Sequence, residues 1–152
     1  THIGEHDTEG WEVAYQFRID EPSVLQNRWD RMHWAAKSRY KKRLQWLVLA
    51  AIGKRPAAPI DGRVWVHVER GSYGVAPDPD GVSGVFKPLM DVLSLPRGQK
   101  TVGLGLITDD SSEYVEHQTS AAIKTRKGEG YTLVTIRSRK ENDDGAEKAR
   151  AL

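Results

Sequence analysis

The sequence lacks cysteine and any long apolar run, and each absence excludes a class of protein. Without cysteine there is no disulfide framework, thiolate metal site or cysteine nucleophile, and we expect an intracellular, cytoplasmic location. An apolar run such as residues 47–52 is far shorter than the roughly 18 residues of a membrane span, so we expect no membrane partner. The N-terminus also shows no signal-peptide pattern.

The histidines show no spacing typical of a zinc site. His33, His67 and His117 form no motif of the His-x3-His kind. We therefore expect no histidine-ligated zinc, and a divalent metal would have to be held by oxygen ligands.

The length of 152 residues fits one domain, with a charged segment at each end. Residues 1–10, which begin with Thr rather than Met, are set apart from the fold prediction. Residues 140–152 are charged and have no apolar face. We expect a single domain over residues 11–139 and a disordered tail on either side of it.

Hydrophobic periodicity predicts four strands and two main helices. The strands are expected at residues 11–19, 63–70, 114–124 and 131–139, and the helices at 30–53 and from about 84–85 to 96–98. This order predicts an α/β (α+β) fold, in which a mixed sheet of about four strands packs against the helices.

The long predicted helix would begin at an Asp30 N-cap and stop at Gly53. Trp29, in the loop before it, fits either the core or a platform that stacks on nucleic-acid bases, whereas Trp34 and Trp46 are predicted to be core. The residues expected to face the core are Trp34, Tyr40, Leu44, Leu47, Val48 and Ala51.

Two acidic clusters on either side of the second helix concentrate the possible chemistry. A proline biases Asp78 towards an extended conformation, so Asp78 and Asp80 would present both carboxylates on one side. Close carboxylates repel each other unless a cation lies between them. One carboxylate of the pair Asp109-Asp110 could complete an Mg²⁺ site with Asp78 and Asp80, with room for a phosphate oxygen. Either cluster alone is more often an ordinary turn, and their joint order favours a site.

Lys87 would lie in the first turn of the second helix, four residues before Asp91. There it could stabilise charge on a scissile phosphate, or it could form an ordinary surface ion pair with Asp91. The residues expected to form the buried side of this helix are Leu89, Met90, Val92, Leu93 and Leu95.

Two basic segments lie on either side of the acidic centre in the sequence. Residues 28–43 contain seven Lys or Arg against one acid, and residues 124–139 contain five against one. Such segments suit a polyanion held beside a metal, although a solvated surface is their commoner use. The residues expected to contact DNA are Asn27, Arg28, Arg31, His33, Lys37, Arg39, Lys41, Lys42, Lys124, Arg126 and Lys127.

The joint order of these motifs resembles that of the RusA family of Holliday-junction resolvases, which are common in phages and prophages. The pattern is Asp-x-Asp, a lysine, Asp-x-Leu and Gly-Leu-Ile-x-Asp-Asp, preceded by Asn27 and His33-Trp34. Here it is carried by Asp78, Asp80, Lys87, residues 91–93 and residues 105–110.

The resemblance implies a homodimeric endonuclease of DNA recombination and repair that cuts four-way junctions with Mg²⁺, for which Mn²⁺ can substitute. It also implies a phage or prophage origin. By position, Asp78, Asp80 and Asp110 would be the catalytic metal ligands and Lys87 the catalytic lysine. Asp109 and Asp91 match further family positions and are additional candidate ligands.

Two departures from the family pattern keep alternatives open. Gly81 follows the second aspartate where the family usually has asparagine, and Lys87 lies further along the chain than in the shortest members. A branched-DNA binding protein that has this fold but has lost cleavage is therefore the alternative function. A metal-dependent hydrolase that acts on a phosphoester other than DNA is a third hypothesis. The two basic segments argue against it, because a small substrate needs no extended basic surface.

Overall fold

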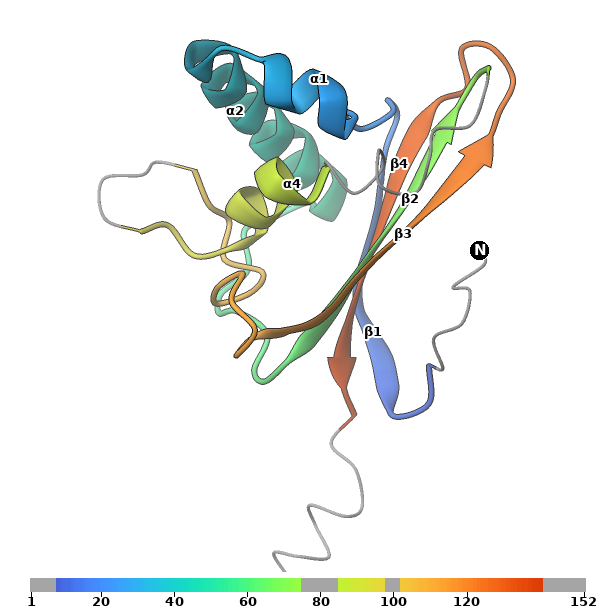
Figure 1. The fold of residues 1–152 in the computed structure, drawn as a ribbon. Helices are drawn as coiled ribbons and strands as arrows, with labels where there is room; N and C mark the ends of the chain where they lie inside the picture. Colours follow the sequence, from blue (N-terminus) through green and yellow to red (C-terminus); the bar gives the residue numbers. More distant parts are fainter. Residues whose placement is uncertain (1–7, 75–84, 98–101, 141–152) are drawn as a thin grey trace, which may run out of the picture.

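The computed structural model describes residues 8–74, 85–97 and 102–140, which form a four-stranded sheet with helices on one side (Figure 1). This arrangement confirms the predicted α+β class and mixed sheet, and each strand is within two residues of its predicted bounds. In chain order the elements are β1 (Trp11–Ile19), α1 (Gln26–Arg31), α2 (Trp34–Ile52), β2 (Val64–Ser72), α4 (Phe86–Leu93), β3 (Val115–Lys124) and β4 (Tyr131–Arg139).

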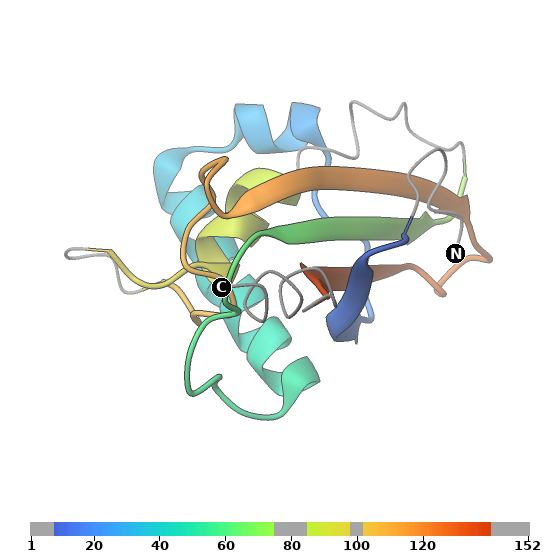
Figure 2. The ribbon, with the colours of Figure 1, turned by 90° about the horizontal axis from the view of Figure 1, so that it is seen from below.

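The strands are ordered β1-β4-β2-β3 across the sheet. β4 is antiparallel to both of its neighbours, whereas β2 and β3 are parallel. A parallel pair needs a crossover connection, and α4 lies in the chain between these two strands. Figure 2 shows β3 and β2 side by side, with α2 passing across the strands.

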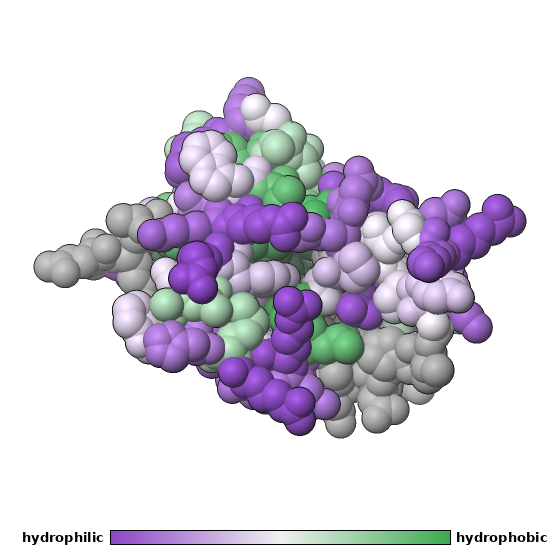
Figure 3. All heavy atoms as spheres, turned by 90° about the horizontal axis from the view of Figure 1, so that it is seen from above, coloured by the Kyte–Doolittle hydropathy of each residue, from purple (hydrophilic) through white to green (hydrophobic). Residues whose placement is uncertain are grey.

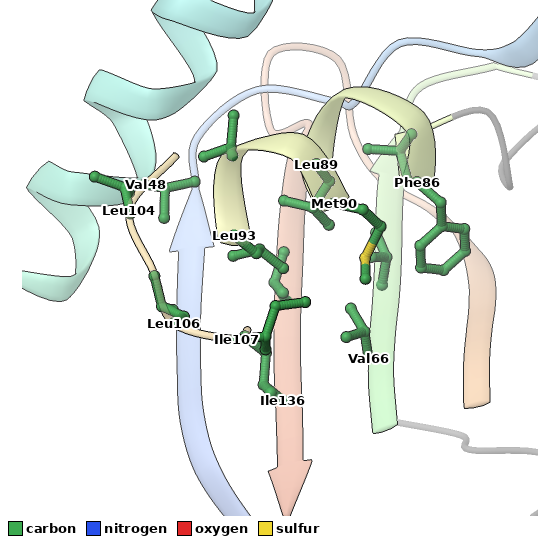
Figure 4. Close-up of a cluster of buried hydrophobic side chains, with 14 of the residues drawn as sticks. Val48, Val66, Phe86, Leu89, Met90, Leu93, Leu104, Leu106, Ile107 and Ile136 are labelled. Carbon is green, nitrogen blue, oxygen red and sulfur yellow. The ribbon is translucent and has the colours of Figure 1, made fainter. Parts of the chain in front are cut away.

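The core lies between the helices and one face of the sheet. Phe17 of β1 pairs with Val134 of β4, which on its other side pairs with Val68 of β2. Ile136 of β4 likewise pairs with Val66 of β2, so all these side chains lie on the same face of the sheet. Burial of apolar area here is the main stabilising contribution to the fold. The residues that pack onto this face from α2, α4 and the segment after α4 include Val48, Phe86, Leu89, Met90, Leu93, Leu104, Leu106 and Ile107 (Figure 4).

The opposite face of the sheet carries an aromatic cluster, and no described helix covers it. Trp65 is fully buried, and its ring meets those of Trp11 and His117 edge-on, at centroid distances of 5.8 and 5.7 Å. The guanidinium groups of Arg137 and Arg139 lie over the Trp65 and Trp11 rings, at 5.1 and 4.1 Å from the ring centroids. Such contacts are favourable because a cation is attracted to the face of an aromatic ring.

A β-bulge in β1 makes one part of the predicted strand pattern wrong. The pairing register with β4 shifts between Val13 and Tyr15, so Ala14 is an extra residue. The shift places Trp11 and Val13 on the opposite face from Phe17, although simple alternation put them together. Val13 is accordingly 54% exposed.

The predicted single helix at 30–53 is two helices, α1 and α2, because the backbone is extended at Met32. The ring centroids of Trp29 in α1 and Tyr40 in α2 are 5.9 Å apart. In one straight helix these residues would be separated by about 16 Å along the axis, so the contact requires the chain to fold back. Trp29 is thereby buried.

The capping residues of α2 differ from the prediction at one end only. His33, not Asp30, is the N-cap, and its Nδ1 accepts a hydrogen bond of 3.2 Å from the backbone N–H of Ala35. At the other end Gly53 stops the helix as predicted, with φ at 90°, a conformation that favours glycine.

Four residues predicted to be core are exposed, so those predictions are wrong: Trp34, Trp46, Ala51 and, after the end of α4, Leu95. The buried side of α2 is set by Leu44 and Val48. Trp46 lies about 200° around the helix from Leu44, and Trp34 lies about 15 Å before it along the axis. Trp34 and Trp46 are 75% and 69% exposed.

Replacing Leu93 by alanine should lower the free energy of unfolding by about 2–5 kcal/mol, because Leu93 is fully buried and the change leaves a cavity. Leu95→Ala, two residues later and 40% exposed, is the matched control and should cost about 1 kcal/mol or less. Urea denaturation of both variants measures the difference. Equal losses of unfolding free energy in the two variants would contradict the burial of Leu93 in the core.

Candidate active site

A cleft of about 510 Å³ lies between α2, α4 and the segment 102–110. Seen from above in Figure 3, hydrophilic side chains spread over much of the surface of the molecule, with apolar atoms visible between them. The cleft combines a basic wall from α2 with acidic residues from the other two elements. The residues that line it are Trp34, Lys37, Ser38, Lys41, Lys42, Asp91, Ser94, Leu95, Arg97, Val102, Asp109 and Asp110.

The basic wall follows from the helical period of α2. Trp34, Lys37, Ser38 and Lys41 recur at spacings of three and four residues, so they share one side of the helix, with Lys42 beside them. The side chains of Lys37, Lys41 and Lys42 all line the cleft. Three ammonium groups within two successive turns make this wall suited to anions.

Asp91 links the basic wall to the acidic residues. It lies in α4, and its carboxylate is 2.6 Å from the Nζ of Lys41. Both side chains are about one-third exposed or less, so the pair is partly shielded from solvent. The ion pair fixes the position of Lys41 within the cleft.

The segment after residue 102 is held against the end of α4 by backbone hydrogen bonds. The N–H groups of Leu104 and Ile107 donate to the carbonyls of Val92 and Leu93, at 2.7 and 3.0 Å. The N–H of Gly105 donates to Ser94 at 3.1 Å. These bonds satisfy carbonyls that the end of a helix leaves without partners, and they carry the chain to Asp109 and Asp110 at the cleft.

Two glycines in this segment are required by close approach and by positive φ. A Cβ at Gly103, where φ is 147°, would lie 2.7 Å from the Ser94 carbonyl oxygen. A Cβ at Gly105, where φ is 77°, would lie 2.8 Å from Leu95 Cδ2. The N–H of Gly103 also donates to Gln45 Oε1 of α2 at 2.7 Å. The segment is thus joined to both helices that border the cleft.

Asp109 and Asp110 are adjacent carboxylates at the cleft, and the first is fixed by hydrogen bonds. The backbone N–H of Asp110 donates to Asp109 Oδ1 at 2.7 Å, and Arg97 forms an ion pair with the same oxygen. Burial alone would raise the pKa of Asp109, but the hydrogen bonds from Asp110 and Arg97 outweigh it, so this pKa lies below its ordinary value. Burial raises the pKa of Asp110, and the neighbouring charges of Asp109 and Asp91 raise it further.

The oxygen donors of this pair fit the needs of Mg²⁺. That ion typically takes one or two carboxylates and completes its coordination with waters and substrate phosphates. Asp110 is exposed at the cleft, and partial desolvation together with the charges of Asp109 and Asp91 raises its pKa. Among the described residues no three acidic or histidine side chains come together. Asp78 and Asp80, the other predicted ligands, lie outside the described residues, as does Gly81.

The other predicted site residues fall into three groups. Lys87 is exposed in the first turn of α4, as predicted, but does not line the cleft, and Asp91 pairs with Lys41. The second group is exposed on or next to α1 and α2, outside the cleft lining, and consists of Asn27, Arg28, Arg31, His33 and Arg39.

The third group lies around the connection between β3 and β4, at a separate hollow. Lys124 and Arg126 line that hollow, together with Arg18 and Tyr131, and Lys127 is exposed nearby. The two predicted basic segments therefore do not form one wall of the cleft. The second basic segment begins at the end of β3 and continues through the connection to β4, which lies on another part of the surface.

The sequence prediction missed Trp34 and Arg97 as cleft residues. Trp34 is three residues before Lys37 and seven before Lys41, so the helical period alone could have placed it on the lysine side. Arg97 directly follows Pro96 beyond the end of α4. No local signal pairs Arg97 with Asp109, because the contact depends on how the segment 102–110 returns to α4.

Asp110→Asn should raise the melting temperature at pH 7 in EDTA by about 1–2 °C, a small shift for a chain of this length. The pKa of Asp110 is raised on folding, so the folded state binds its proton more tightly and loses stability as pH rises through that pKa. The advantage of the variant should vanish near pH 3, where Asp110 is protonated in both states. Asp61→Asn, an exposed change outside the cleft, is the control, and thermal denaturation from pH 3 to 8 is the measurement.

Comparison with known proteins assigns no family to the chain. No protein-family model matches it, and no curated protein matches it either. Within the part of the chain that the structure describes, no helix has the length and apolar character needed to cross a membrane.

Proposed function

We propose that this chain is a Mg²⁺-dependent endonuclease that cuts four-way DNA junctions, as the resemblance to the RusA family implies. The observation that supports it most is the cleft in which Asp109 and Asp110 share one space with three lysines of α2. Carboxylates for a metal and cations for phosphates are the two requirements of metal-assisted phosphodiester cleavage.

The lysines of α2 would bind the DNA backbone. Lys37, Lys41 and Lys42 follow one side of a straight helix, so they can contact successive phosphates of one strand. Asp91 holds Lys41 in place through their ion pair. Lys87, exposed one helical turn before Asp91, would contact a phosphate at the edge of the same site. Phosphate contacts of this kind position the DNA and carry no sequence information.

Asp110 would hold the metal together with Asp78 and Asp80, and Asp109 or Asp91 is a further candidate ligand. When bound, Mg²⁺ lowers the pKa of a water molecule and neutralises charge that develops on the scissile phosphate. Arg97 keeps Asp109 ionised and fixed beside Asp110, so the carboxylate pair is held in place before substrate arrives.

A homodimer follows from the symmetry of the substrate. A four-way junction is two-fold symmetric, and symmetric cutting requires two active sites related by a dyad. Residues outside the cleft, including Arg28, Arg39, Lys124 and Arg126, are exposed and would contact the arms of the junction. The partners proposed are therefore branched DNA and a second copy of the chain.

Cleavage of a labelled four-way junction tests the proposed function. The wild-type protein should cut with Mg²⁺ or Mn²⁺ and not in EDTA, and Asp110→Asn should cut at least about 100-fold more slowly, because the loss of a metal ligand removes several kcal/mol of transition-state stabilisation. Asp61→Asn should cut at the wild-type rate.

Gel-shift binding of the same junction distinguishes the alternative. If the wild-type protein binds the junction but does not cut it with either metal, the nuclease proposal fails and the binding-only function stands. If it neither binds nor cuts, both fail.

The salt dependence of binding tests the role of the lysine row. Lys42→Ala should weaken junction binding in EDTA and reduce the slope of log K against log salt by about 0.9, the value for one lost phosphate contact. Lys54→Ala, which removes an exposed lysine outside the cleft, should leave the slope closer to that of the wild type. Identical slopes for the two variants would show that α2 does not contact phosphates.

A further inference from the structure

Trp34 is a large aromatic side chain that the core does not use. It is the first residue of α2, it is 75% exposed, and it lines the cleft beside the lysine row. A single exposed hydrophobic residue is ordinary on a protein surface, so it is the position of Trp34 in the cleft, rather than its exposure, that points to a role. Trp34 lies in the same cleft as the proposed catalytic carboxylates, and this position indicates a role in substrate binding.

The surroundings of Trp34 suit a nucleotide better than a protein side chain. Lys37 and Lys41 follow it by one and two helical turns, and both line the same cleft. The His33 ring lies against the Trp34 ring at a centroid distance of 5.4 Å and an angle of 39°, which restricts the motion of the indole. A fixed aromatic face beside a row of cations is the combination that binds a base together with its phosphates.

The base would have to be unstacked from one of its neighbours. In an intact duplex the faces of the bases are stacked on one another, so a tryptophan at the edge of a cleft cannot reach them. At a branch point or in a single strand these faces are accessible, and stacking of a base on an aromatic ring tolerates any sequence. Trp34 would therefore distinguish branched or single-stranded DNA from duplex, which phosphate contacts alone do not do.

We propose that Trp34 stacks on an unstacked base of the bound DNA and so gives the cleft its preference for branched over duplex substrates. The inference rests on the proposed function, since it takes DNA as the ligand. Trp34 is here a residue that determines specificity, and no chemical step is assigned to it.

The same helix provides a matched control. Trp46 is also in α2 and is 69% exposed, but it is twelve residues further on, about 120° around the helix, and does not line the cleft. If exposed tryptophan alone promoted DNA binding, the two residues would act alike. If position decides, only Trp34 contributes.

The test measures binding in EDTA, where no cleavage occurs, to a single strand that contains 2-aminopurine and to a duplex of the same sequence. Trp34→Ala should weaken single-strand binding by about 5- to 150-fold, the range found when one stacking residue is lost, and should change duplex binding less than 2-fold. It should also abolish the quenching of 2-aminopurine fluorescence on binding. Trp34→Phe should retain part of both signals, and Trp46→Ala should behave as the wild type.

Three outcomes would overturn the inference, and they are distinguishable. If Trp34→Ala binds single strand as the wild type does, stacking is wrong while the proposed nuclease function is untouched. If Trp34→Ala changes the molecular mass measured by sedimentation, the residue is a contact between subunits. If the wild-type protein binds no DNA of any form, the proposed function fails and the inference with it.

Discussion

The backbone hydrogen bonds between the end of α4 and the segment after residue 102 are the constraint on which the cleft depends. Six of the eight residues of α4 are buried, so the helix cannot shift without disturbing the core. Its last carbonyls accept the N–H groups of Leu104 and Ile107, and Gly105 is bonded to Ser94. The separation between Asp91 and the Asp109–Asp110 pair is therefore determined by core packing, although these carboxylates lie at the surface.

The same constraint explains why the segment contains two glycines. Gly103 and Gly105 adopt positive φ at points where a Cβ would meet the chain that leaves α4. A side chain at Gly103 would push against backbone atoms, which cannot rotate away as a side chain can. The segment would then leave α4, and the hydrogen bond to Gln45 of α2 would be lost with it. The two glycines thus allow the segment that leads to Asp109 and Asp110 to pass close to the end of the buried helix α4.

The sequence predicted the elements whose signals are local and missed the features that depend on distant contacts. Alternation predicted β1 and β2, high β-propensity predicted β4, and the stop at Gly53 followed from the conformational freedom of glycine. The break between α1 and α2 could not be predicted, because it depends on the contact of Trp29 with Tyr40. For the candidate site, the lysines of α2 were predicted from the density of basic residues, and Asp91 and the acidic pair from motif order. The pairing of Arg97 with Asp109 was not, since no periodicity relates those two residues.

The two halves of α2 differ in how they pack against the core, and this difference explains why Trp34 is exposed. Leu44 and Val48 in the second half are buried against the sheet and α4, so the second half anchors the helix. Among the residues of the first two turns only Tyr40 packs against the core and against Trp29, so the core places no demand on most of their side chains. The helix begins well before the residues that pack against the sheet. Its first turns can therefore hold lysines and an aromatic residue at fixed spacing beside the acidic residues. A rigid element anchored at one end is better suited to this than a loop, because the positions of the binding residues are set by the helix itself.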